Sequence, residues 1–269
     1  MTTLELLNLD FVRATLAACA LLGVLSGVMA PLVVLRQMSF SVHATSELAL
    51  MGASAALLFG LNVGVGAIAG AVVAALVLAA LGLKGQQDSA VGVVMSFGMG
   101  LSVLFIHLYP GNSGRALSLL TGQIVGVNSQ DLWLLGLTTA VVVAAVAVCW
   151  RPLLFASADP EMAAASGVPV RAMAFLFAVL VGVASAQSVQ IVGALLVMSL
   201  LITPGAAAAQ ITASPRRAVV YSVVFAELSA VGGTLLSLAP GVPVSVFVAF
   251  VSFGIYLVCR GVGRYRNAR

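Results

Sequence analysis

The chain has 269 residues, of which 62% are hydrophobic and 7% are charged, and its net charge is +4 at pH 7. This composition, with a mean hydropathy of +1.18, excludes an ordinary soluble domain, and the few scattered basic residues exclude a nucleic-acid-binding surface. Long runs of Leu, Val, Ala and Gly without polar alternation exclude the strands of a membrane β-barrel. The sequence therefore predicts an all-α protein: a polytopic membrane helical bundle forming a single domain over residues 1–269.

A spanning helix needs roughly 20 predominantly apolar residues, and Gly, Pro and charged clusters divide the chain into about nine such segments, with about eight to ten possible. Acidic residues precede the first segment and no convincing signal cleavage site follows, so we expect a retained helix. The boundary between the sixth and seventh segments is placed at Gln187 and Ser188. The candidates are residues 11–35, 40–59, 61–82, 89–108, 131–150, 172–186, 188–210, 217–238 and 243–259.

The basic residues predict how these helices are oriented. If the C-terminal tail is cytoplasmic and about nine helices precede it, every Arg and Lys except Arg13 and Arg115 lies on the cytoplasmic side. Cytoplasmic loops of membrane proteins are enriched in Lys and Arg, so this arrangement satisfies the positive-inside rule. We therefore expect the N-terminus outside the membrane and the C-terminus inside.

An outer polar segment, residues 109–131, is too long for a tight turn and contains a short apolar run. Gly122 and Gly126 break this run. We therefore expect a re-entrant or interfacial helix in this segment.

An inner polar segment, residues 157–171, has the signals of a short cytoplasmic helix. Asp159, Pro160 and Glu161 form a helix-start signal, an alanine run follows, and Gly167 ends it. Such a helix is either a solvated connector or a docking site for a cytoplasmic protein. The chain contains no G-x-x-x-x-G-K-[ST] loop, so an ATPase that drives it would be a separate chain.

Two ionisable residues, His43 and Glu47, lie inside the second apolar segment. Ionisable side chains are costly in hydrocarbon, and they mark functional sites by default. Positions i and i+4 share one helix face, and imidazole and carboxylate groups both bind zinc, manganese or iron. The pair is therefore either a metal site or a pair that bonds to itself or a neighbouring helix and stabilises packing.

Several motifs in this order resemble the permease subunit of the metal-type (zinc/manganese) ABC importers, over residues 29–258. The resemblance implies a homodimer in the bacterial cytoplasmic membrane. This homodimer would receive its cargo from an extracytoplasmic solute-binding protein and be driven by a separate ATP-binding subunit. The motifs are RQMSF, LMGAS, QQDSAVGVVM, SLLTGQIVGV, ADPEMAAASGVPV and VGALLVMSLLITPGAAAAQITASP.

This resemblance assigns roles to the inner helix and to the ionisable pair. It implies that the inner helix docks in a groove of the ATPase and couples the two subunits. The divalent metal would be the transported substrate. ATP and Mg²⁺ would bind the partner subunit, and no cofactor would bind this chain. The chain is thus expected to be a transporter subunit rather than a self-sufficient enzyme. The residues expected to couple to the ATPase are Asp159, Pro160, Glu161, Ala164 and Gly167.

The metal-binding positions depart from the family pattern. Family members carry Asp at the position of His43 and His at the position of Glu47, so the order is inverted here. A two-fold axis would bring a second pair and complete a set of two imidazoles and two carboxylates. The departure fits one alternative, an importer of a metal chelate such as haem or a siderophore. A second alternative is a secondary transporter with His43, Glu47 and Glu227 as coupling groups, although the internal repeats typical of that class are not detected. Glu227 is otherwise expected to be a packing residue.

Overall fold

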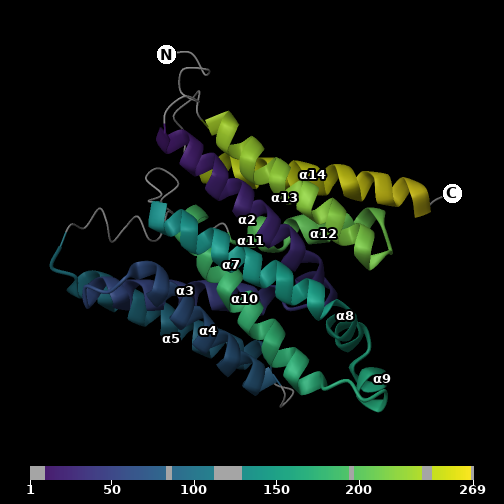
Figure 1. The fold of residues 1–269 in the computed structure, drawn as a ribbon, viewed down its shortest axis with the longest axis horizontal. Coiled ribbons are helices and arrows are strands. Elements are labelled where there is room, and N and C mark those ends of the chain that lie inside the picture. The colour runs from purple at the N-terminus through teal and green to yellow at the C-terminus, as the bar shows by residue number, and fades with distance from the viewer. Residues whose placement is uncertain (1–9, 83–86, 112–128, 194–196, 238–243, 268–269) are drawn as a thin grey trace.

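The computed structural model describes residues 10–82, 87–111, 129–193, 197–237 and 244–267. Every regular element in these ranges is an α-helix, and the long helices lie side by side (Figure 1). The helices are α2 (Asp10–Leu35), α3 (Ser39–Leu58), α4 (Val63–Gly82), α5 (Gln87–Leu108), α7 (Ser129–Val148), α8 (Trp150–Ala158), α9 (Pro160–Ala165), α10 (Val170–Val192), α11 (Val197–Leu201), α12 (Thr203–Ile211), α13 (Pro215–Ser237) and α14 (Val244–Asn267).

Seven helices of the described chain are long and apolar enough to cross a membrane, namely α2, α4, α5, α7, α10, α13 and α14. Helix α3 has 20 residues, the length of a span, but it includes His43 and Glu47. The predicted all-α, multi-pass membrane bundle is therefore confirmed. The helix predicted between residues 109 and 131 falls largely on residues 112–128, which lie outside the described residues.

The predicted helix boundary at Gln187 and Ser188 is wrong. Helix α10 continues through both residues to Val192 and ends at Gly193, whose φ is +86°. The Ser188 hydroxyl donates a hydrogen bond to the Ala184 carbonyl of its own helix. Because the backbone of a helix satisfies such a side chain, a polar residue does not have to end a helix in hydrocarbon.

The segment after α10 is also broken rather than continuous. Helices α11 and α12 are separated at Ile202, and Pro204 lies in the first turn of α12, where its missing N–H costs no hydrogen bond. Gly205 then packs against the backbone of α2, because a Cβ at this position would lie 2.7 Å from the Pro31 nitrogen. A glycine is required at this contact.

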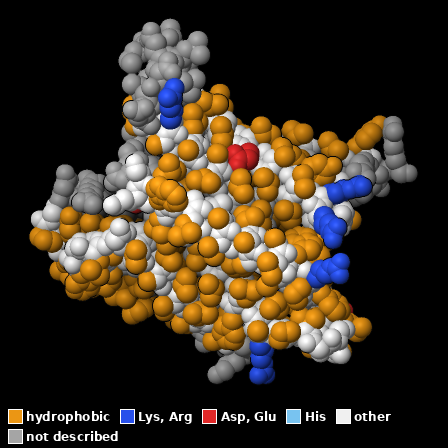
Figure 2. Space-filling view, in the orientation of Figure 1, with side chains coloured by type: hydrophobic (Ala, Val, Ile, Leu, Met, Phe, Trp, Pro, Cys, Tyr) orange, Lys and Arg blue, Asp and Glu red, His pale blue; other side chains and the backbone are white. Residues whose placement is uncertain are grey.

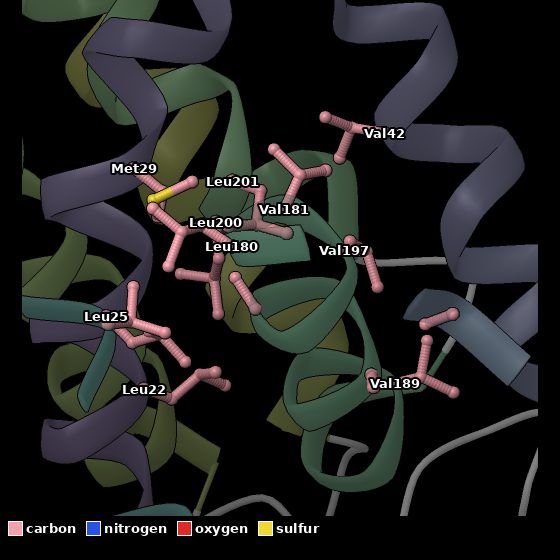
Figure 3. Packing of buried hydrophobic residues seen from close by; sticks show 14 of the residues in the cluster. Leu22, Leu25, Met29, Val42, Leu180, Val181, Val189, Val197, Leu200 and Leu201 are labelled. Atoms are coloured by element: carbon pink, nitrogen blue, oxygen red, sulfur yellow. The ribbon is translucent and has the colours of Figure 1, made fainter. Parts of the chain in front are cut away.

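The core lies where α2, α10 and α11 meet the start of α3. Figure 3 shows Val181, Leu200 and Leu201 between Met29 of α2 and Val42 of α3. All five side chains are almost fully buried. This cluster joins α3 to the rest of the bundle, so the position of the ionisable pair is set by helices that are distant in sequence.

Basic side chains gather at one edge of the molecule. Figure 2 shows Lys and Arg groups along the right-hand edge, where Figure 1 places α8, α12 and the C-terminal end of α14. Hydrophobic side chains cover most of the remaining face. This distribution is what the positive-inside rule expects of the cytoplasmic edge of a membrane protein.

Candidate functional site

Helix α3 carries the ionisable pair near its N-terminal end. It begins at Ser39, directly after a tight turn from α2, so His43 lies one helical turn from its start. Glu47 follows one turn later, and only 5% of its surface is exposed. The two residues lie four positions apart, so they share one face of α3. The structure thus brings together the two residues that the sequence predicted as metal ligands.

The imidazole of His43 has an unsatisfied buried atom. Its Nδ1 is inaccessible to solvent and has no hydrogen-bond partner among the described residues. Buried polar atoms nearly always have a partner, so each exception needs an explanation. In its neutral form, with the proton on Nε2, such an imidazole nitrogen is able to bind a transition metal.

Unlike His43 Nδ1, the buried hydroxyl groups of α3 all have hydrogen-bond partners within the same helix. Thr45 donates to the carbonyl of Ser41 at 2.7 Å, Ser46 donates to the carbonyl of His43 at 2.7 Å, and Ser54 donates to Met51 at 3.0 Å. These hydroxyls therefore need no partner from another helix. His43 and Glu47 are therefore the side chains of α3 that are available to bind a ligand.

A close glycine contact fixes α3 against α4. A Cβ added to Gly52 would lie 2.9 Å from the Gly70 Cα, and Gly66 also touches the Gly52 backbone. Small residues at such crossings allow helix backbones to approach closely in a membrane. This contact sets the rotation of α3, and with it the direction of His43 and Glu47.

The predicted cytoplasmic helix forms as α9, with a cap at each end. The Asp159 carboxylate accepts a hydrogen bond from the Met162 N–H at 3.0 Å, and Pro160 occupies the first turn. Gly167, with φ of +82°, ends the helix in a Schellman motif, in which the Val168 N–H bonds to the Ala163 carbonyl.

Most side chains of α9 face outwards. Met162 is 57% exposed, and Glu161 and Ala164 are also exposed, whereas Ala163 is fully buried and seats the helix on the protein. This arrangement provides a short, rigid helix on the surface that a second protein could grip.

Two further ionisable residues lie away from the pair. Glu227 of α13 is half-buried, and its carboxylate rests in a notch over Gly23 of α2, where an added Cβ would lie 2.8 Å from Oε1. Figure 2 shows an acidic group on the face where α2 and α13 lie. His107 is exposed in the last turn of α5. Among the described residues, no group of three or more His, Cys, Asp or Glu side chains could hold a metal ion.

One buried contact was missed by the sequence analysis, which used Arg36 only to orient the helices. The Arg36 guanidinium lies 4.2 Å from the ring centroid of Phe177, and its Nε donates to Ser157 Oγ at 2.6 Å. Arg36 follows the spanning segment of α2, and burial lowers its pKa to about 10, so it stays charged at neutral pH. Arg36 lies more than a hundred positions from both Ser157 and Phe177 in the sequence, so no local pattern could have indicated the contact.

The sequence of this chain is similar to known transport proteins over nearly its full length. Residues 8–262 match the ABC 3 transport family. The chain is 28% identical over 255 residues to the manganese transport system membrane protein MntC of Halalkalibacterium halodurans, which covers 94% of this chain and 87% of that protein. It is 28% identical over 219 residues to the high-affinity zinc uptake system membrane protein ZnuB of Haemophilus influenzae, which covers 80% and 84% respectively.

Solved structures share the fold. The structure of PsaBC from Streptococcus pneumoniae in complex with Fab superposes with a TM-score of 0.87 at 24% identity, over 96% of this chain and 94% of that chain. An inward-facing conformation of a putative metal-chelate type ABC transporter superposes with a TM-score of 0.66 at 18% identity, over 94% and 85%.

Proposed function

Because this chain belongs to the ABC 3 transport family, we infer that it is the membrane permease subunit of an ABC importer for a divalent transition metal. The manganese and zinc transport proteins among its relatives support Mn²⁺ or Zn²⁺ as the cargo. The family assignment removes the secondary transporter as an alternative. Transport is driven by a separate ATPase, and delivery of the cargo by an extracytoplasmic binding protein is part of this proposal.

In this proposal, His43 and Glu47 bind the metal as it crosses the membrane. The observation that carries the assignment is the buried Nδ1 of His43, which has no hydrogen-bond partner in the described chain and belongs to a residue on the same helix face as Glu47. Because one protomer supplies two ligands, a second copy of the chain related by a two-fold axis would complete a four-ligand set. The inverted order does not prevent this, since positions i and i+4 converge in either order.

Helix α9 is proposed to be the contact with the ATPase. Its two caps make it rigid, Glu161 and Ala164 are exposed on it, and Gly167 is exposed directly after it. Asp159 and Pro160 hold its start in place. ATP binding and hydrolysis in the partner would move this helix, and the two permeases would then alternate between outward-open and inward-open states.

Uptake by the reconstituted complex tests this function. Vesicles that contain the permease, its ATPase and its binding protein are given radiolabelled Mn²⁺ or Zn²⁺, with His43→Ala, Glu47→Ala and His107→Ala compared with the wild type. Loss of a metal contact is expected to reduce uptake by at least about tenfold in the first two variants. His107→Ala, an exposed histidine, is the control and should transport normally.

Two results would contradict the proposal in different ways. Normal uptake in both His43→Ala and Glu47→Ala would remove the pair from the path and leave the permease role intact. Uptake of haem or a siderophore complex in place of the free ions would replace the cargo with a metal chelate.

A further inference from the structure

Arg36 joins three helices at the inner end of the bundle. It follows the last residue of α2, its guanidinium lies over the fully buried ring of Phe177 in α10, and its Nε donates to Ser157 in the last turn of α8. The hydroxyl of Ser157 in turn donates to the carbonyl of Leu153. A planar guanidinium can stack on a ring and donate from its edge at the same time, which the ammonium group of lysine cannot do.

The turn after Arg36 is tight and connects it directly to α3. The Met38 N–H bonds to the Val33 carbonyl and the Gln37 N–H bonds to the Val34 carbonyl, which is the hydrogen-bond pattern of a Schellman motif. Gln37 occupies the left-handed position with φ of +54°, where glycine is the usual residue. Non-glycine residues in this conformation are strained and tend to lie in functional segments.

This turn also starts α3 without a flexible linker. The Val42 N–H bonds to the Met38 carbonyl, so the helix hydrogen bonds begin at the turn itself. His43 is the next residue. A displacement of Arg36 is therefore passed to the ionisable pair through a continuous hydrogen-bonded backbone.

On its other side, Arg36 is joined to α9. Ser157 lies two residues before Asp159, which both ends α8 and caps α9. The Asp159 N–H bonds to the Phe155 carbonyl, so no loop separates the two helices. The buried Ala163 seats α9 on the protein. Ser157 and α9 are thus expected to move together.

We propose that Arg36 is a positioning residue that transmits movement of α9 to α3, and so couples the ATPase to the metal ligands. The proposal rests on the proposed function, in which α9 meets the ATPase and His43 and Glu47 bind the cargo. The contrasting role for Arg36 is a charge anchor at the cytoplasmic membrane edge. An anchor needs only a positive charge, whereas a coupling residue needs the stacked and hydrogen-bonded geometry.

The ratio of metal transported to ATP hydrolysed separates these two roles. Both quantities are measured in the same vesicles with Mn²⁺ or Zn²⁺, for Arg36→Lys, Arg36→Gln and Ser157→Ala. The ratio is expected to fall about fivefold or more in both Arg36 variants, while ATP hydrolysis and the melting temperature change little. Ser157→Ala, which removes the acceptor for Arg36 Nε but leaves the guanidinium on the Phe177 ring, should lower the ratio by a smaller factor. Arg171→Gln is the control, because Arg171 is an exposed cation at the inner end of α10.

Three results would overturn the proposal. A normal ratio in Arg36→Lys would show that charge alone matters. A parallel loss of uptake, ATP hydrolysis and thermal stability in the Arg36 variants would show a structural role. If Arg36→Gln does not assemble, Ser157→Ala decides, and a normal ratio in that variant would refute the link.

A distance measurement tests the link between α9 and α3 separately from the identity of the cargo. Spin labels at Phe40→Cys on α3 and Met162→Cys on α9, both exposed positions, report the separation of the two helices within one protomer. If Arg36 links them, the separation stays the same with and without ATP in the wild type and changes in Arg36→Gln. Equal changes in both proteins would overturn the link, whatever the cargo is.

Discussion

Gly52 of α3 and Gly70 of α4 are in backbone contact, so close that a Cβ on Gly52 would lie 2.9 Å from the Gly70 Cα. Overpacking a tight contact typically costs about 1–3 kcal/mol. We therefore expect Gly52→Ala to lower the melting temperature of the detergent-solubilised permease, and to reduce metal uptake because α3 rotates. Gly100→Ala on α5 is the matched control, since open space surrounds this glycine and the substitution should not destabilise the protein. Equal melting temperatures for the two variants would contradict the role of this contact.

Exchanging carboxylate and imidazole at the two proposed ligand positions, into the order that the family resemblance implies, should preserve transport. In the double variant His43→Asp with Glu47→His, one imidazole and one carboxylate still converge from positions i and i+4. Each single change instead leaves two carboxylates or two imidazoles. Coupled residues deviate from additivity by roughly 1 kcal/mol, so uptake by the double variant should exceed that of either single variant by roughly fivefold. Measured metal uptake that follows the product of the two single effects would show that the residues do not act as a pair.

The contact between Glu227 and Gly23 should behave as a coupled packing pair. A Cβ on Gly23 would lie 2.9 Å from the Glu227 carboxyl carbon, so Gly23→Ala forces the acidic side chain out of its notch. We expect Gly23→Ala to lower the melting temperature, and Glu227→Ala to relieve much of that loss in the double variant. The interaction free energy from the double-mutant cycle should be about 1 kcal/mol or more. Additive effects would show that Glu227 does not fill the notch.

The cap of α9 should matter for assembly more than for global stability. Replacing an N-cap aspartate by alanine costs about 1 kcal/mol of helix stability, which is large for a helix of six residues. Asp159→Ala is therefore expected to weaken co-purification with the ATPase while the melting temperature of the permease stays close to that of the wild type. Asp159→Asn, which also caps helices well, should restore assembly. Failure of the asparagine variant to restore it would point to the charge of Asp159 and away from the cap.

The sequence by itself determined the class of the protein and the elements that depend on local signals. Long apolar runs without alternation have one solution in a bilayer, because only a helix satisfies its own backbone there. Helix α9 could be predicted because its cap residues act within a few positions of one another. The pairing of His43 with Glu47 on one helix face also follows from helical spacing alone.

Only the tertiary structure decided where the helix breaks fall and which polar groups are left without partners. Gln187 and Ser188 did not end a helix, because α10 continues through them and its own backbone satisfies Ser188. The contact of Arg36 with Ser157 joins positions 121 residues apart. Such contacts are set by how closely helices pack and which faces they present to one another, and these properties leave no periodic pattern in a chain that is apolar almost throughout.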